Sequence, residues 1–348
     1  MSTNTPNSFL NLSQNSSSTE PLPALRPGDS LFETAQAASQ YIRAARASST
    51  RRAYESDWHD FLAWCKEHQI EPLPAAPSSI ALYLTSLAQR GRKVATIARR
   101  LTSINVAHKR VGLAPPTRNQ QLITETMQGI RRTLGVRQKV KQPIDMELLK
   151  RSLASAEGAL AASRDRAIFL VGFAGGMRRS ELAAMKFEDL TWHKRGITLF
   201  LPHSKTDQEG QGREVELPLG SQDNNVPLAE CTCPVRALEQ WLKIANITSG
   251  PIFRRISYAQ SVGKTGLDPR SIAEIVKRLL RRTGLSEKEV ARYGAHSLRA
   301  GFATEAYSKG ASELAIMRQT GHKSSAMVRR YIRSDKADRM AAASKLGL

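Results

Sequence analysis

Four short stretches of the sequence carry side chains that could act together on one anionic group. They are GGMRRSEL at 175–182, HSKTDQEGQG at 203–212, HSLR at 296–299 and GHKSSAMVRRYIR at 321–333. They supply two arginines, a lysine, two histidines and a tyrosine, namely Arg178, Lys205, His296, Arg299, His322 and Tyr331. Guanidinium groups present paired donors to phosphate or carboxylate oxygens, and imidazoles exchange protons near neutral pH. The set therefore indicates a site that binds an anion and moves protons.

Signatures of nucleotide-dependent and metal-dependent chemistry are missing from the sequence. It has no GxxxxGK(S/T) phosphate loop, no GxGxxG, no HExxH and no acids spaced for two metal ions. The three cysteines are too few for a disulfide scaffold, and the CTC pair at 231–233 has no further ligands at zinc spacing. We therefore expect neither a cofactor nor a metal ion.

The order of these residues is more informative than any one of them. An Arg, a Lys, an HxxR, a GH pair and a Tyr nine residues after that His follow one another within residues 144–335. In this the sequence resembles the tyrosine recombinase (phage integrase) family, whose members cut and rejoin DNA, and HSLRAG with GH and RYIR resembles its Cre-like members. One departure is Arg179, where the family usually has an apolar residue. Counting back from Ser180 and Glu181 assigns the family's arginine to Arg178.

The resemblance implies a role for the nucleophile and the three main cations. Tyr331 would attack a phosphodiester and form a 3′-phosphotyrosyl bond. Negative charge would build on the non-bridging oxygens, where Arg178 and Arg299 can bind through rigid paired donors. Lys205 corresponds to the family's general acid, which protonates the leaving 5′ oxygen. Because the phosphotyrosyl bond keeps the energy of the broken phosphodiester, another 5′ hydroxyl can reverse the step without ATP or metal.

Two histidines and a glutamate complete the predicted site. His296 and His322 can add hydrogen bonds or transfer protons near neutral pH. His296 and Arg299 stand three residues apart, so a helix would turn both toward one scissile phosphate. Glu181, three residues after Arg178, either orients His296 or a neighbouring arginine or is a simple surface acid.

Three functions are compatible with this residue set. The first is a site-specific recombinase that exchanges strands through a Holliday junction, acting as a homotetramer on double-stranded DNA with inverted-repeat target sites. The second is a type IB topoisomerase, which uses similar residues to relax DNA without exchanging partners. The third is a DNA-binding protein that keeps the fold without the chemistry, although the intact residue set argues against it. The resemblance favours the recombinase.

The charge balance of the chain favours a polyanionic partner such as nucleic acid. Lys and Arg number 52 against 31 Asp and Glu, which gives a formal net charge of +21. No apolar run reaches the ~18 residues of a membrane span, and the N-terminus lacks a secretory signal. We therefore expect a soluble cytoplasmic protein associated with a bacterial or phage nucleoid and not with a membrane.

The N-terminal third of the chain predicts a disordered tail followed by a helical domain. Residues 1–30 are rich in Ser, Asn, Thr and Pro, whereas apolar residues recur at helical spacing over 31–136, enough for about five helices. Residues 90–141 hold thirteen Lys or Arg and one acid, Glu125. This predicts a helical domain with a basic DNA-binding face, with a merely solvated basic face as the alternative. In type and position the domain resembles the core-binding (SAM-like) domain of the tyrosine recombinase family. The candidate DNA contacts are Arg92, Lys93, Arg99, Arg100, Arg131, Arg132, Lys139 and Lys141.

The rest of the chain predicts a linker and a second domain. RQKVKQP at 137–143 has the composition of a linker, and 144–348 combines helical segments at 145–157, 163–174, 234–246 and 269–283 with strands at 196–202 and 213–219. The expected fold class is mainly α with a small antiparallel sheet: an all-α N-terminal domain plus an α+β catalytic domain. By resemblance the two domains form a C-shaped clamp on DNA. The tail after Tyr331 is expected to form a helix that packs on its own core or on a neighbouring copy.

Overall fold

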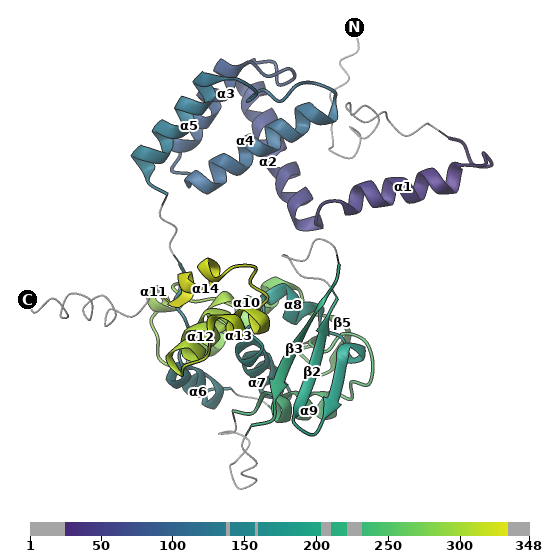
Figure 1. The fold of residues 1–348 in the computed structure, drawn as a ribbon, viewed down its shortest axis with the longest axis vertical. Coiled ribbons are helices and arrows are strands. Elements are labelled where there is room, and N and C mark those ends of the chain that lie inside the picture. The colour runs from purple at the N-terminus through teal and green to yellow at the C-terminus, as the bar shows by residue number, and fades with distance from the viewer. Residues whose placement is uncertain (1–24, 137–139, 157–158, 203–209, 221–231, 333–348) are drawn as a thin grey trace, which may run out of the picture. The chain divides into compact units, whose positions relative to one another are not determined.

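A computed structural model describes residues 25–136, 140–156, 159–202, 210–220 and 232–332 (Figure 1). The chain divides between Gln138 and Lys139 into two compact units, residues 1–138 and residues 139–348. They are called the N-terminal unit and the C-terminal unit below.

The N-terminal unit is helical throughout residues 32–134, apart from its connecting turns. Its elements are α1 (Phe32–Ala44), α2 (Ser48–Glu67), α3 (Pro77–Gln89), α4 (Val94–Arg110) and α5 (Gln121–Leu134). The core is built from α2 to α5 and includes Trp58, Phe61, Tyr83, Ile97 and Ile123. Helix α5 ends at Gly135, whose φ of 70° favours a residue without a side chain. The prediction of about five helices without a strand is confirmed for the described part of this unit.

A buried polar network in the N-terminal unit corrects one predicted DNA contact. Arg100 on α4 is buried and pairs with Asp60 and, at 3.6 Å, with Asp57, both on α2. The Tyr83 hydroxyl donates to Asp60 at 2.8 Å and accepts from Arg100 at 3.1 Å. Burial raises the pKa of Asp57, although the charges of Arg99 and Arg100 oppose this. Arg100 therefore joins α2, α3 and α4 inside the unit, and its prediction as a DNA contact is wrong.

His108 joins the loop before α3 to helix α4. Its Nε2 accepts the backbone N–H of Ala75 at 2.9 Å, so Nδ1 carries the proton that is donated to the Ile104 carbonyl at 2.9 Å. Burial lowers the pKa of His108 below its ordinary value. The neutral ring is therefore a structural part of the N-terminal unit.

The C-terminal unit combines helices with short strands. Its helices are α6 (Met146–Ala154), α7 (Ala159–Ala174), α8 (Arg179–Ala184), the 3-10 turn η2 (Phe187–Asp189), α9 (Pro234–Ile244), α10 (Pro269–Arg282), α11 (Glu287–Val290), α12 (His296–Ser308), α13 (Glu313–Thr320) and α14 (Ser325–Ile332). Its strands are β1 (Leu190–His193), β2 (Gly196–Leu201), β3 (Arg213–Pro218), β4 (Arg254–Ile256) and β5 (Val262–Gly266). The four helical segments and both strands predicted by residue range are present, with their ends shifted by up to a few residues.

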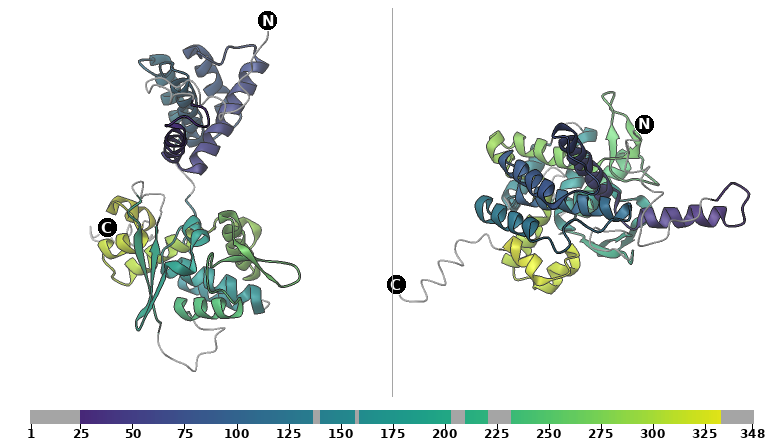
Figure 2. Two further views of the ribbon diagram at one scale, coloured as in Figure 1. Left: turned by 90° about the vertical axis from the view of Figure 1, so that its right-hand side faces the viewer. Right: turned by 90° about the horizontal axis from the view of Figure 1, so that it is seen from above.

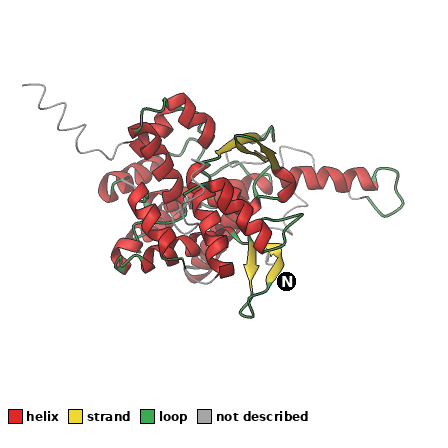
Figure 3. Ribbon diagram, turned by 90° about the horizontal axis from the view of Figure 1, so that it is seen from below, coloured by secondary structure: helices red, strands yellow, loops and turns green. Residues whose placement is uncertain are grey.

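The strands form two separate antiparallel sheets, drawn in yellow in Figure 3. The first has the order β1-β2-β3, with Trp192 opposite Ile197 and Leu199 opposite Val215. The second pairs β4 with β5. Strands β1, β4 and β5 are not predicted from the sequence. They have only 4, 3 and 5 residues, none of them fully buried, so no alternating apolar pattern marks them.

Helix α7 organises the C-terminal unit and positions the segments that carry the predicted site. Its apolar residues are buried in a core shared with β2, β3, α9 and α12. Ile197 and Leu199 of β2 and Val215 and Leu217 of β3 point into that core, while the residues between them face outward or are only partly covered. Strand β3 lies beside α13, and α12 packs against α7, α13 and α14 (Figures 1 and 2). The start of β3 is thereby brought next to the C-terminal end of α13.

Candidate active site

Helix α12 begins at His296 and carries both His296 and Arg299, as their spacing predicts. The chain entering the C-terminal unit holds this helix end, because the Ile144 N–H donates to the Ser297 carbonyl at 3.1 Å. Gly301 permits this close approach, since a Cβ at that position would lie 2.0 Å from the Ile144 carbonyl oxygen. Close backbone packing therefore fixes the start of α12.

Arg299 is a fully buried arginine with donors that its surroundings do not use. Nη1 donates to the carbonyl of Gly176 at 2.7 Å and to that of Thr320. Nε and Nη2 have no hydrogen-bond partner among the described residues. Burial, followed by the charge of Arg178, lowers the pKa of Arg299 to about 10, so the side chain remains charged at neutral pH. Nε and Nη2 are therefore two donors on one guanidinium face that can bind an anion.

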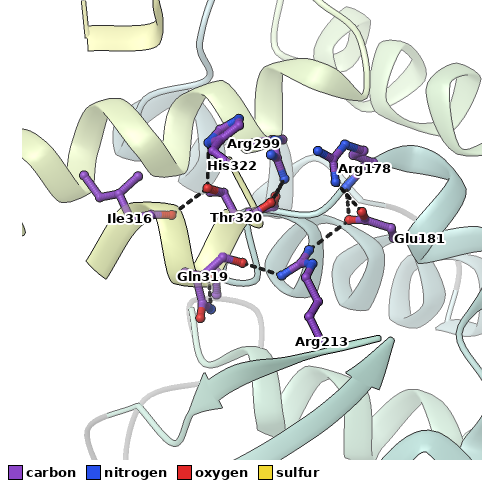
Figure 4. A network of polar contacts seen from close by, with 10 residues as sticks. Arg178, Glu181, Arg213, Arg299, Ile316, Gln319, Thr320 and His322 are labelled. Atoms are coloured by element: carbon purple, nitrogen blue, oxygen red, sulfur yellow. Dashed lines mark hydrogen bonds and ion pairs between the residues drawn. The ribbon is translucent and has the colours of Figure 1, made fainter. Parts of the chain in front are cut away.

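Arg178 stands immediately before α8, and Glu181 on that helix binds it twice. Glu181 Oε1 accepts from Arg178 Nη1 at 2.6 Å, and Oε2 accepts the Arg178 backbone N–H at 2.8 Å. Glu181 is only 3% exposed and also accepts from Arg213 Nη2 at 3.1 Å (Figure 4). Its interpretation as a surface acid is therefore wrong. Arg179 is exposed at the first position of α8, which leaves Arg178 as the arginine that faces the site.

His322 follows the C-terminal end of α13 and is buried. The Thr320 hydroxyl donates to the Ile316 carbonyl at 2.5 Å and shares a 2.7 Å hydrogen bond with Nδ1 of His322. Burial, followed by the charges of Arg299 and Arg178, lowers the pKa of His322 to about 3. The ring is therefore neutral at physiological pH and held by Thr320.

Tyr331 lies on α14 with its hydroxyl 2.8 Å from Nε2 of His296. Its ring centroid is 5.4 Å from that of His296 and 5.3 Å from that of His322. The Thr304 hydroxyl on α12 donates to the Tyr331 carbonyl at 3.3 Å, and Val328 on α14 is buried against α12 and α13. The phenol oxygen thus directly contacts a group that can accept its proton.

The cations of the site destabilise one another's charged forms. The pKa of His296 is lowered first by burial and then by the charges of Arg299 and Arg178. Arg178 and Arg213 also act to lower the pKa of Arg299 and of His322. An anion bound among these groups would relieve the repulsion. The arrangement can therefore bind a phosphodiester and stabilise charge that builds on its oxygens.

The structure brings together the predicted site residues that it describes, which are Arg178, Glu181, His296, Arg299, His322 and Tyr331. Lys205 falls in 203–209, outside the described residues, so its role stays a prediction. The contacts add Arg213 and Thr320, which the sequence analysis missed. Thr320 adjoins the GH pair and could have been suspected from that position, whereas no motif marks an arginine at the start of a strand.

The predicted DNA contacts occupy different settings. Four are exposed near the ends of α4 and α5, namely Arg92, Lys93, Arg131 and Arg132. Arg99 is also exposed but pairs with Asp57 at 3.2 Å. Lys141 Nζ donates to the Ala291 carbonyl within the C-terminal unit, and Lys139 lies outside the described residues. Apart from Arg100, these contacts stay predictions.

The described residues were expected to hold no metal site. Within the described ranges, no group of three or more His, Cys, Asp or Glu side chains could hold a metal ion. Cys65 and Cys233 are buried free thiols, and Cys231 lies outside the described residues. None of the described helices is long and apolar enough to cross a membrane.

Comparison with known sequences agrees with this geometry. Residues 144–338 match the phage integrase family, and residues 39–109 match the N-terminal SAM-like domain of phage integrases. The chain belongs to the phage integrase family. The longer match contains every residue of the site, from Arg178 to Tyr331. The shorter match contains most of α2 to α4 of the N-terminal unit.

Similar members of the phage integrase family are recombinases by name. The chain is 41% identical over 300 residues to the integrase/recombinase xerD homolog of Selenomonas ruminantium, covering 85% of this chain and 84% of that protein. It is 26% identical over 310 residues to the recombinase cre of Escherichia phage P1, covering 84% and 86% of the two chains. The similarity therefore extends through both units.

Solved structures of phage integrase relatives share the fold. The Tn1549 transposon integrase in complex with transposon right end DNA has a TM-score of 0.59 at 13% identity, covering 90% of this chain and 98% of that chain. The XerH recombinase bound to palindromic difH substrate has a TM-score of 0.55 at 22% identity, covering 78% and 73%. The predicted class, mainly α with a small antiparallel sheet, is confirmed, although the described residues form two such sheets where one was predicted.

Proposed function

We propose that this chain is a site-specific tyrosine recombinase that cleaves and rejoins DNA with Tyr331 as the nucleophile. One observation carries the proposal: the Tyr331 hydroxyl lies 2.8 Å from His296, on the helix that also carries Arg299 with its two unused donor atoms. A nucleophile, a proton acceptor and an anion-binding group thus meet at one point. Similarity to named recombinases over 85% of the chain supports the same function.

In the proposed cleavage step, the Tyr331 oxygen attacks a backbone phosphorus and the bond from that phosphorus to the 5′ oxygen breaks. His296 accepts the phenolic proton through its 2.8 Å contact. Arg178 and Arg299 bind the non-bridging oxygens while negative charge builds on them. Lys205 donates a proton to the leaving 5′ oxygen. The products are a 3′-phosphotyrosyl bond and a free 5′ hydroxyl.

Rejoining is proposed to be the reverse of cleavage with a different strand. The 5′ hydroxyl of a partner duplex attacks the 3′-phosphotyrosyl phosphorus, and Tyr331 leaves and recovers its proton. One phosphodiester is formed for each one broken, so the exchange needs neither ATP nor a cofactor. Two such rounds, separated by a Holliday junction, exchange both strands.

We propose double-stranded DNA with inverted-repeat target sites as the partner. The net charge of +21 supports a polyanionic partner. The exposed candidates for phosphate contacts are Arg92, Lys93, Arg99, Arg131, Arg132 and Lys141. We further propose that the protein acts on this DNA in the cytoplasm, in association with a bacterial or phage nucleoid. Lys139, which lies outside the described residues, is also proposed to contact a DNA phosphate.

We propose that four copies assemble on DNA, with residues 333–348 of one copy docking on the next. A relative, the lambda integrase, is solved as a tetramer bound to a Holliday junction, with a TM-score of 0.54 at 18% identity. In this chain an apolar cavity of about 530 Å³ between α6, α7, α12 and α13 offers a docking place, lined in part by Leu149, Phe173, Phe302, Ala306 and Ile316. The tail supplies Met340, Leu346 and Leu348 as apolar partners.

Truncation after Arg333 tests the docking proposal, because it removes the tail and keeps Tyr331. We expect the truncated chain to bind single sites and to fail to form tetramers in sedimentation of the DNA complex. A fall in the unfolding midpoint of the free monomer, with tetramers retained, would instead show that the tail packs on its own copy.

Recombination between two DNA molecules tests the proposed function. The target is located first, by nuclease protection of the DNA that flanks the protein's own gene. Two linear duplexes of different length that carry this target should yield recombinants of predictable length, and a scrambled target should yield none. Relaxation of any supercoiled plasmid without recombinants would indicate a topoisomerase. Binding without cleavage would indicate a DNA-binding protein of the same fold.

A further inference from the structure

We propose that Arg213, the first residue of β3, is a positioning residue that holds the Arg178 segment and the His322 segment at a fixed separation. The inference rests on the proposed function, because it gives Arg213 a part in strand cleavage. Its evidence is a set of contacts that span two elements far apart in the sequence.

One side of the Arg213 guanidinium faces the segment that carries Arg178. Arg213 Nη2 lies 3.1 Å from Glu181 Oε2, and the other carboxylate oxygen of Glu181 lies 2.6 Å from Arg178 Nη1 (Figure 4). Glu181 is therefore shared by two arginines. Loss of Arg213 would leave the buried carboxylate bound to Arg178 alone among the described cations, and would remove the contact that ties the Arg178–Glu181 pair to β3.

The other side of the guanidinium faces the segment that carries His322. Arg213 Nη1 donates to the Gln319 carbonyl at 2.8 Å. The next residue, Thr320, accepts from Arg299 through its carbonyl and bonds His322 through its hydroxyl. Arg213 thus binds the peptide immediately before the turn that orients both of these side chains.

The turn after Thr320 packs directly against the Arg213 side chain. Gly321 has a φ of 66°, and a Cβ added there would lie 2.8 Å from Arg213 Nε and 2.9 Å from its Cδ. Gln319 makes the same connection with its side chain, since its Nε2 donates to the carbonyls of Glu216 on β3 at 2.7 Å and Ala174 at 2.9 Å. The C-terminal end of α13 is therefore fixed to β3 by the carbonyl and the side chain of Gln319, with Gly321 packed against Arg213.

Arginine suits this position because its planar guanidinium can bind two acceptors at once in a fixed geometry. A lysine would keep the charge but bring a single flexible ammonium to one acceptor. The Arg213 side chain is only 15% exposed, so water replaces its contacts poorly. Its charge also acts on the site, because Arg213 is among the cations that lower the pKa of Arg299 and of His322.

Arg164 offers a matched control for Arg213. It is also a largely buried arginine that bridges a carboxylate and a carbonyl, with Nη2 2.8 Å from Asp165 Oδ1 and Nη1 donating to the Arg254 carbonyl at 3.2 Å. These partners, Asp165 and Arg254, are not residues of the candidate site. Substitution of Arg164 therefore reports the loss of a buried ion pair alone.

The test compares Arg213→Lys, Arg213→Met and Arg164→Lys in the full chain. For each we would measure the Kd for a target duplex nicked near the cleavage position, the rate of covalent adduct formation at saturating protein, and the unfolding midpoint. We expect adduct formation to slow about 10- to 100-fold in both Arg213 variants with Kd unchanged, as for a small misplacement of reacting groups. Arg164→Lys should lower the unfolding midpoint and keep the wild-type adduct rate.

A measurement without DNA separates this inference from the proposed function. At neutral pH the ring-proton NMR shifts of His322 should change in Arg213→Met, because the peptide before its turn loses the contact with Arg213 Nη1, and should not change in Arg164→Lys. Wild-type adduct formation in Arg213→Met, or unchanged His322 ring-proton shifts, would overturn the inference. Failure of the wild-type protein to form any adduct would instead overturn the proposed function, and the His322 ring-proton shifts would still decide the role of Arg213.

Discussion

Arg299 is proposed to bind the reacting phosphate. It is buried and charged, and within the described residues its hydrogen bonds to protein groups are made through Nη1. In Arg299→Lys we expect adduct formation to slow ~10²- to 10³-fold, the usual cost of removing a preorganised donor from such a site. The rate at saturating protein on nicked duplex measures this effect. A variant that cleaves as fast as wild type would show that Arg299 does not bind the reacting phosphate.

The protonation of His296 should set the pH below which the rate of adduct formation declines. Only the neutral ring can accept the Tyr331 proton, and burial together with Arg299 and Arg178 lowers its pKa. Adduct formation should therefore persist as the pH falls below ~6.5, the ordinary pKa of histidine, and decline only at lower pH. The second-order rate constant between pH 5 and 8 measures this. A decline that begins above pH 6.5, or an unchanged acid limb in His296→Gln, would contradict His296 as the acceptor.

At the scale of residues, the sequence predicted the groups whose chemistry depends on motif spacing. The pairs formed by His296 with Arg299 and by Arg178 with Glu181 are each three residues apart, so one turn of helix or its cap brings each pair together. Arg213 could not be found in this way. Its partners Glu181 and Gln319 are 32 and 106 residues away, and only the packing of β3 against α13 brings them within reach.

Helix α4 and the loop before α3 share the neutral His108, which predicts a pH dependence of stability. Burial lowers the folded-state pKa of His108, so its contribution is complete above the unfolded pKa of ~6.5 and is lost as the pH falls toward the folded value. The wild-type free energy of unfolding should therefore fall from pH 6.5 to 5 by up to ~1.4 kcal/mol per pH unit from this group.

His108→Leu separates this effect from those of the other histidines. The variant leaves the Ala75 N–H without its acceptor, which costs ~1–3 kcal/mol, but it removes the titrating group. Its stability should therefore be lower at pH 7.5 and should fall less steeply with acid than that of the wild type, as measured by urea unfolding. Parallel slopes in the two proteins would show that His108 does not titrate on unfolding.

For the secondary-structure elements, the length of each element decided whether its type could be predicted from the sequence. Helices such as α4 and α10 repeat their apolar residues over 17 and 14 positions, which fixes both their type and their buried face. Strands β1, β4 and β5 are too short to show a period. The burial of Arg100 could not be predicted for a different reason. Its neighbours in the sequence are basic, and they do not reveal that Asp57 and Asp60 of α2 face it inside the unit.

For the whole molecule, the net charge of +21 predicts DNA binding that weakens steeply with salt. Arg131 is exposed near the end of α5, so Arg131→Gln should reduce the slope of log K against log salt by ~0.9 without changing stability. Arg100→Gln should have the opposite effects. It should lower the free energy of unfolding by ~3 kcal/mol, because buried Asp57 loses one of its cationic partners. Under conditions where the variant is fully folded, its slope of log K against log salt should equal that of the wild type. If the two variants changed the slope equally, Arg131 could not be distinguished from Arg100 as a surface residue that contacts DNA phosphates.

The central claim is that Tyr331 attacks the scissile phosphate. On a nicked duplex that carries the protected target, the wild-type protein should form a protein–DNA adduct stable to SDS, and mass spectrometry of the digested adduct should place the nucleotide on Tyr331. Tyr331→Phe should bind the same duplex with unchanged Kd and form no adduct. An equal amount of adduct in Tyr331→Phe, or a nucleotide attached to another residue, would contradict the account.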